Sequence, residues 1–273
     1  MSKSMSRRSF LALMGGSAAV LGLGLVGCGS GSGTASTAAA SGSAASGSGK
    51  KYIIATDTTF APFEFTDSSN NFVGIDVDLL AAIAKETGFE YDLQSLGFDA
   101  AVAALESNQA DGVIAGMSIT DERKKKYDFS DSYYESYVCA AAKDGGDVKS
   151  LDDLKGKKVA GKNGTQSLSW AESIKDQYGF EITYFDTSDL MYQDVLTGNS
   201  AVCFEDYPVM AYGVKQGNGL TIIGKDDGSY ATPYAFAVMK GKNPELIENF
   251  NKGLKSLKDS GKYDEIVNKY LQA

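Results

Sequence analysis

The sequence predicts an α/β fold made of two modest lobes. From residue 51 onward, short apolar runs alternate with segments of helical period. The chain has 273 residues, and single domains cluster around ~100–200 residues. Its hydrophobic fraction of 43% and charged fraction of 22% are ordinary for a globular protein. Two such lobes leave a cleft between them, which is where small ligands usually bind.

Strands are expected where short apolar runs are bounded by turn residues. These runs are 52–56, 89–94, 112–115, 137–142, 157–161, 182–185, 201–204 and 234–239. Helices are expected over 77–87, 100–107, 166–178, 189–196, 244–258 and 263–271, with a further helix from Asp206 and a charged turn from Thr120 to Lys126. Asp76 and Asp99 are expected to cap the first two helices, and Gly88 to end the first. This alternation predicts largely parallel sheets.

Charge and composition exclude several classes of function. The chain contains no histidine and carries a net charge of −9. Without histidine there are no Ser-His or Cys-His nucleophile pairs and no His-ligated metal sites, so we expect no metal and no cofactor. An acidic chain also argues against a nucleic-acid partner, which favours a basic face.

The N-terminus has the pattern of an export signal. Arg7 and Arg8 precede an apolar run over 11–27, which is short for a membrane span of ~20 residues. Leu25-Val26-Gly27-Cys28 resembles a bacterial lipobox, whose cysteine becomes diacylglycerol-modified at the mature N-terminus. Residues 6–11 also resemble the twin-arginine export motif. We therefore expect a signal peptide over 1–27 and a lipid on Cys28, the alternative being an uncleaved membrane anchor.

Residues 28–50 are expected to tether the protein to the membrane surface. Positions 29–49 hold only Gly, Ser, Ala and Thr, which have nothing to bury. A flexible chain of this length spans roughly 25 Å. The two other cysteines, Cys139 and Cys203, lie in apolar runs and are expected to be buried thiols, although a disulfide is an open alternative outside the cytoplasm.

Three segments carry a family resemblance: residues 55–65 (ATDTTFAPFEF), 74–80 (GIDVDLL) and 111–123 (DGVIAGMSITDER). They resemble the binding motifs of bacterial amino-acid-binding proteins of ABC transporters, the family 3 solute-binding proteins, and most closely the glutamine-binding ones. The resemblance implies a two-lobed periplasmic-binding-protein-like fold of type II, with a ligand cleft between lobes joined by two hinge crossings. It implies a first lobe over 51–134 and 234–273 and a second lobe over 135–233.

The same resemblance implies a set of ligand-binding residues. They are Asp57, Phe60, Phe98, Ala115, Gly116, Ser118, Arg123, Lys162, Gln166, Glu205 and Asp206. Arg123 matches the arginine that grips the ligand α-carboxylate, a group that a planar guanidinium can bind with two parallel hydrogen bonds. Gln166 matches a backbone N–H donor to that carboxylate, at a helix N-terminus that favours anions.

The α-ammonium and the side chain of the ligand have their own matches. Asp206 matches the carboxylate that pairs with the ammonium, helped by Ser118 and by the carbonyl of Gly116. An N-cap role for Asp206 is compatible with this one. Phe60 and Phe98 match aromatic residues that sandwich the ligand side chain.

Asp57 and Lys162 bear on specificity. In glutamine-binding relatives, an aspartate and a lysine at these positions contact the side-chain amide. Lys162 would repel a cationic side chain. Glu205 replaces a histidine of those relatives, and if it paired with Lys162 it would free Asp57 for a cation. Glutamine is therefore the leading ligand, with arginine or lysine as the alternative.

The implied role is capture and delivery of a free L-amino acid. A ligand that touches both lobes favours the closed form, with hinges near 133–137 and 231–236. The partners would be an ABC permease and, through the lipid, the outer face of the cell membrane. We expect a monomer that is not an enzyme. The alternatives are a cyclohexadienyl-dehydratase-like enzyme using Glu205 beside Lys162, and a sensory protein that presents its ligand to a receptor.

Overall fold

The computed structural model describes residues 50–230 and 233–272. The predicted signal sequence, the predicted lipidation site Cys28, the predicted linker up to residue 49 and positions 231, 232 and 273 lie outside the described residues. Within the described part of the chain, no helix is long and apolar enough to cross a membrane.

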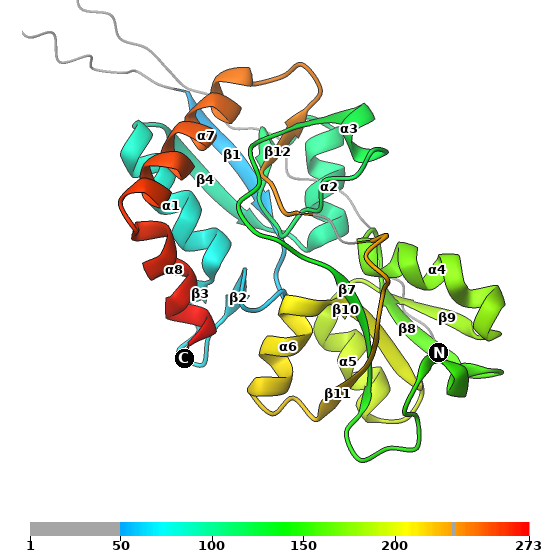
Figure 1. Ribbon diagram of the computed structural model, residues 1–273. Coiled ribbons are helices and arrows are strands. Elements are labelled where there is room, and N and C mark those ends of the chain that lie inside the picture. The colour runs from blue at the N-terminus through cyan, green and yellow to red at the C-terminus, as the bar shows by residue number, and fades with distance from the viewer. Residues whose placement is uncertain (1–49, 231–232, 273) are drawn as a thin grey trace, which may run out of the picture. The chain divides into compact units, whose positions relative to one another are not determined.

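The first sheet has the strand order β4-β1-β5-β12-β6 (Figure 1). Its strands are β1 Lys51–Thr56, β4 Glu90–Ser95, β5 Gly112–Val113, β6 Tyr127–Phe129 and β12 Ala237–Met239. The helices beside it are α1 Ile75–Thr87, α2 Phe98–Glu106, α3 Arg123–Lys126, α7 Pro244–Asp259 and α8 Lys262–Leu271, and a small hairpin pairs β2 Phe65–Thr66 with β3 Phe72–Val73.

Strand β1 shows why this sheet is covered on both faces. Its side chains alternate, because successive residues of a strand point to opposite faces. Tyr52 and Ile54 join the core made with α1, α7 and α8, whereas Ile53 and Ala55 pack into a second core with α2. Both faces of β1 are therefore apolar, as in a buried parallel strand.

The second sheet has the order β11-β7-β10-β8-β9. Its strands are β7 Val138–Lys143, β8 Lys158–Lys162, β9 Glu181–Phe185, β10 Val202–Asp206 and β11 Leu220–Lys225. The helices beside it are α4 Gln166–Tyr178, α5 Ser188–Leu196 and α6 Tyr207–Lys215, with a 3₁₀ turn, η1, over Leu151–Leu154. Cys139 and Cys203 both point to the core beneath α5 and α6, where they are buried free thiols.

The chain passes between the two sheets twice, once from β6 to β7 and once from β11 to β12 (Figure 1). The two crossings pair with each other around Tyr234. Its N–H donates to the carbonyl of Tyr134 over 2.8 Å, and its carbonyl accepts from the N–H of Tyr133 over 2.9 Å. Tyr234 therefore lies in paired backbone between the sheets, and not in the longer strand expected from 234.

Strand direction differs from the sequence-based prediction, because both sheets are mixed. Strand β7 is antiparallel to β10 and β11, and β12 is antiparallel to β5 and β6. Each of these two strands is the first after a crossing, so the chain enters the new sheet against the direction of its parallel strands. Only β1, β4 and β5, and β8, β9 and β10, keep the expected parallel pairing.

Two predicted helix caps were wrong. Helix α1 begins at Ile75, so Asp76 lies in its first turn, and its buried carboxylate instead accepts from the N–H of Gly116 over 2.9 Å. Helix α2 begins at Phe98, because Gly97, at φ 93°, turns the chain into the helix before Asp99 is reached. The predicted end of α1 at Gly88 is confirmed, with a left-handed C-cap.

Candidate functional site

Several of the predicted binding residues come from the carboxyl ends of parallel strands in both sheets, and Phe98, Arg123 and Gln166 each open a helix. In the first sheet Asp57 follows β1 and Ala115 comes shortly after β5. In the second sheet Lys162 ends β8 and Asp206 ends β10. Ligands of open α/β sheets bind at this end of the strands, so the fold itself brings these side chains together.

A narrow cavity of about 10 Å³ lies among them. It is lined by Asp57, Phe60, Phe98, Ala115, Gly116, Ser118, Arg123, Lys162, Thr165, Gln166 and Asp206. Glu205 is the one predicted binding residue that does not line it. Thr165 lines it without having been predicted, although its place before a helix in Gly-Thr-Gln-Ser is a sequence signal for an N-cap.

Arg123 opens the short helix α3 and reaches across to the second sheet. Its Nη1 donates to the carbonyl of Ser118 over 2.8 Å, and its Nη2 to the carbonyl of Gly164 over 2.9 Å. The guanidinium also lies 5.4 Å from the centre of the Phe98 ring. One end of the guanidinium fork is thus held by the segment before α3, and the other end by the loop that precedes α4.

Helix α4 presents its N-terminus to the same cavity. Thr165 is its N-cap, and the Thr165 hydroxyl accepts from the N–H of Leu168 over 3.2 Å and donates to the carbonyl of Lys162 over 2.8 Å. The helix runs for 13 residues from Gln166. The free backbone N–H groups of its first turn favour an anion at this end of the cavity.

Asp206 has one occupied and one unoccupied carboxylate oxygen. Its Oδ2 accepts from the hydroxyl of Tyr234 over 2.5 Å, and Tyr234 in turn accepts from Ser136 over 2.9 Å. Its Oδ1 is buried and has no hydrogen-bond partner among the described residues. Burial and the nearby charge of Glu205 raise the pKa of Asp206 to about 7. An orphaned acceptor in a cavity wall is suited to a donor from a ligand.

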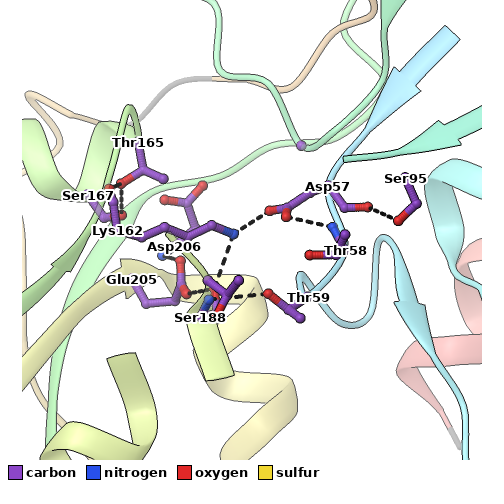
Figure 2. Close-up of polar contacts among 12 residues, drawn as sticks. Asp57, Thr58, Thr59, Ser95, Lys162, Thr165, Ser167, Ser188, Glu205 and Asp206 are labelled. Carbon is purple, nitrogen blue, oxygen red and sulfur yellow. Dashed lines mark hydrogen bonds and ion pairs between the residues drawn. The ribbon is translucent and has the colours of Figure 1, made fainter. Parts of the chain in front are cut away.

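Lys162 and Asp57 form an ion pair across the two sheets at the other end of the cavity (Figure 2). Both side chains are 1% exposed. The ammonium of Lys162 also donates to the hydroxyl of Ser188 over 3.3 Å and lies 5.2 Å from the centre of the Phe60 ring. The carboxylate of Asp57 accepts from the N–H of Thr58 over 2.6 Å.

Glu205 lies behind this pair and is fully buried. Its Oε2 accepts from Ser188 over 2.9 Å and from Tyr192 over 2.7 Å, and its Oε1 accepts from the N–H of Asp206 over 2.9 Å. Burial raises the pKa of Glu205, while the charge of Lys162 opposes that rise. Among the described residues, Lys162 forms its ion pair with Asp57, and it meets Glu205 through the Ser188 hydroxyl (Figure 2).

Three residues around the cavity could not be inferred from the sequence. Ser188 and Tyr192 reach Glu205 from α5, and Tyr234 reaches Asp206 from the second crossing. Each acts through a side chain that is distant in the sequence. No local motif marks any of them.

Comparison with known proteins places the chain in a family. Residues 52–273 match the family model of the bacterial extracellular solute-binding proteins, family 3. The chain belongs to this family. The arginine-binding extracellular protein ArtP of Bacillus subtilis is 34% identical over 230 residues, covering 81% of this chain and 86% of the relative. The family is one of solute-binding proteins, so the chain is an extracellular solute-binding protein.

Two solved structures bear on the arrangement of the sheets. Substrate binding domain 2 of Lactococcus lactis GlnP, in an open conformation, is 42% identical with a TM-score of 0.56, covering 83% of this chain and 97% of that chain. An ancestral arginine-binding protein bound to glutamine is 38% identical with a TM-score of 0.73, covering 81% and 97%. The less identical, ligand-bound protein superimposes better, which agrees with the contacts that Arg123 and Lys162 make across the sheets.

Proposed function

We propose that this solute-binding protein captures L-glutamine and delivers it to the permease of an ABC importer. Its family and relatives make it an amino-acid-binding protein of an ABC transporter. The observation that carries the choice of glutamine is the buried ion pair of Lys162 with Asp57 in the cavity wall. The pair offers a donor and an acceptor side by side, which is what a carboxamide needs.

The α-carboxylate and α-ammonium would bind at the opposite end. Arg123 can turn its two N–H groups from backbone carbonyls to the carboxylate, a stronger charge-assisted acceptor, while the N-terminus of α4 adds backbone donors at Gln166. The ammonium would donate to the unpartnered Oδ1 of Asp206, with Gly116 and Ser118 completing its shell. These contacts are shared by every α-amino acid, so they set affinity and not specificity.

Specificity would come from the side-chain end. The amide oxygen of glutamine would accept from Lys162, and its NH₂ would donate to Asp57. The rings of Phe60 and Phe98 would flank the methylene groups. An arginine side chain would bring a third charge beside Lys162 and would have to displace that ammonium from Asp57. Neutral glutamine leaves the ion pair in place.

A cationic amino acid is the second candidate, and the surroundings of Glu205 favour it. Glu205 accepts hydrogen bonds from two hydroxyls and one backbone N–H, and an environment made of donors suits an ionised carboxylate. Two carboxylates, Asp57 and Glu205, then face one ammonium, Lys162, at this end of the site. That surplus of negative charge would attract arginine, the ligand named for ArtP.

Delivery depends on closure of two lobes. We assign residues 51–134 and 234–273 to one and 135–233 to the other, with hinges at 133–137 and 231–236. A ligand held by Asp57, Ser118 and Arg123 on one side and by Lys162, Gln166 and Asp206 on the other binds the closed form better than the open form, which shifts the equilibrium. The permease would then recognise the closed lobes of a monomer.

The anchor and export route belong to this proposal as well. A diacylglycerol on Cys28 and the linker over 29–49 would hold the protein near the outer face of the membrane, and Arg7-Arg8 would direct export by the twin-arginine route. A dehydratase-like reaction has less support, because it would need Glu205 at the substrate and Glu205 does not line the cavity. A sensory role would use the same binding chemistry, and a pull-down for a receptor would distinguish it.

Calorimetric titration tests the ligand. The purified protein is unfolded and refolded to remove carried-over ligand, then titrated with glutamine, arginine, lysine, glutamate and histidine. Tight binding of glutamine with weak or no binding of arginine and lysine is the expected result. Preference for arginine or lysine would select the second candidate. No binding of any of the five amino acids would refute both the glutamine and the cationic candidate.

A further inference from the structure

Ser188 stands between two buried charges at the specificity end of the site (Figure 2). It is the first residue of α5 and is 1% exposed. Its hydroxyl accepts from Lys162 over 3.3 Å and donates to Glu205 over 2.9 Å. A hydroxyl has one proton and two lone pairs. Ser188 donates its proton to Glu205 and accepts from Lys162 with one of its lone pairs.

The backbone of Ser188 fixes this position independently of its side chain. Its N–H donates across the sheets to the hydroxyl of Thr59 over 3.2 Å, and Thr187, the N-cap of α5, accepts from the N–H of Leu190 over 3.4 Å. The start of α5 is therefore held from both sides. These contacts hold the backbone of Ser188, so its hydroxyl can leave Lys162 and Glu205 only by changing its χ1 rotamer.

Neutral donors satisfy the Glu205 carboxylate. Ser188 and Tyr192 donate hydrogen bonds to Oε2, and the N–H of Asp206 donates one to Oε1. A buried carboxylate must be paired or hydrogen-bonded, because an unpaired charge is costly to bury. Since these donors meet that need without a cation, Lys162 remains free to pair with Asp57. The charged groups that face Glu205 are Lys162 and Asp206, with the thiol of Cys203 nearby.

We infer that Ser188 is the positioning residue that sets the specificity of this site. By keeping Lys162 on Asp57 and away from Glu205, it makes the site select a neutral amide over a cationic side chain. Without the hydroxyl, Glu205 would lack a donor and Lys162 would turn to it. Asp57 would then be left open to the guanidinium or ammonium of a ligand. This inference rests on the proposed function and deepens it.

The test compares affinities for glutamine and arginine in wild type and in Ser188→Ala by calorimetry. We expect the ratio of the arginine Kd to the glutamine Kd to fall at least tenfold in Ser188→Ala. Tyr192→Phe, which removes the other donor to Oε2, should move the ratio the same way. Ser200→Ala is the matched control, because it removes a buried serine hydroxyl that has no hydrogen-bond partner among the described residues and lies before the start of β10, and it should leave the ratio unchanged.

A double variant separates the electrostatic cause from a mere packing defect. In Ser188→Ala/Glu205→Gln the charge that would draw Lys162 away is gone, so the ratio should stay near that of Glu205→Gln alone. A ratio that is unchanged in Ser188→Ala, or that falls equally with and without the Glu205 charge, would overturn the inference.

Titration of the ligand-free protein keeps this test distinct from the test of the proposed function. Carbon-13 NMR of the Glu205 carboxyl should show a lower apparent pKa in Ser188→Ala than in wild type, because direct pairing with Lys162 favours the charged form. If wild type binds neither ligand but the pKa falls, the proposed function fails while the placement of Lys162 by Ser188 stands. If the pKa rises or stays the same, Ser188 does not hold the two charges apart.

Discussion

Tyr234 donates a 2.5 Å hydrogen bond to Asp206, joining a crossing between the sheets to the carboxylate that faces the cavity. The pair is buried, and Ser136 from the other crossing donates to the same tyrosine hydroxyl. The hydrogen bond lowers the pKa of Asp206 against the opposing effect of burial. Both crossings therefore support the carboxylate in the ionised form that an ammonium requires.

Tyr234→Phe should weaken binding of every α-amino acid about tenfold at pH 7. Hydrogen bonds to charged groups are worth ~1.5–3 kcal/mol, and their loss here raises the pKa of Asp206 further. The loss of affinity should shrink at pH 9, where Asp206 is ionised in both proteins. Calorimetry at the two pH values measures this. Tyr134→Phe is the control, since the Tyr134 ring stacks on Tyr234 and its hydroxyl makes none of these bonds.

Arg123→Ala should abolish measurable ligand binding and leave the fold intact. Loss of a charged partner of a bound carboxylate costs ~2–5 kcal/mol, or about 30-fold to several thousand-fold in Kd. The side chain is only partly buried and bonds two carbonyls, so the thermal midpoint should move by a few degrees at most. Lys124→Ala, the exposed neighbour that pairs with Asp121, is the control. Near-native affinity in Arg123→Ala would refute its role at the carboxylate.

Most of the helices and strands could be predicted from the sequence, because strand and helix periods are local properties. Helix α4 begins and ends at the predicted residues, and the apolar run in β1 was placed within one residue. Strand direction was not accessible, since antiparallel β7 and β12 are as apolar as their parallel neighbours. Strand β11 is an edge strand that was not predicted, although its Leu-Thr-Ile-Ile run is apolar and β-branched.

The residues of the site also divide into those that local sequence motifs indicate and those that only the folded structure reveals. Those that line the cavity lie at strand ends or helix starts, and the family resemblance could point to them. Ser188, Tyr192 and Tyr234 act through Glu205 and Asp206, and their roles depend on distances that only the folded chain defines. The contact of Lys162 with Asp57, in preference to Glu205, depends on the same three-dimensional detail.

Ligand affinity and stability should respond to pH in opposite directions around Asp206. Its pKa of about 7 lies above the ordinary value of 3.8. Between these values the folded protein holds a proton that the unfolded chain has lost, so the ligand-free protein becomes less stable as pH rises toward 7. Affinity should instead rise over that range, because the ligand ammonium needs the ionised carboxylate. Urea unfolding and calorimetry from pH 5 to 8 measure both, and parallel trends would contradict the assignment.

Glu64 and Asp76 form a buried carboxyl pair that contacts Gly116 of the site through Asp76. Both oxygens of Glu64 and the Oδ1 of Asp76 are buried without a partner among the described residues, while the Oδ2 of Asp76 binds the Gly116 N–H and the Tyr133 hydroxyl. Burial and the charges of Asp76 and Asp57 raise the pKa of Glu64, and Lys162 opposes them. One proton shared between the two carboxyls would satisfy the Oδ1 of Asp76 and one of the two Glu64 oxygens.

Glu64→Gln should therefore stabilise the protein, and increasingly so as pH rises above the ordinary glutamate pKa of 4.5. The folded wild type retains a proton that its unfolded chain releases, so its free energy of unfolding falls with pH. A glutamine amide donates to Asp76 at every pH and removes the part of that dependence that comes from Glu64. Urea unfolding at pH 5, 7 and 9 measures the difference. Glu90→Gln, on the exposed edge of β4, is the matched control and should show no such trend. A variant that is less stable than wild type at pH 9 would mean that Glu64 is ionised and stabilised as an anion.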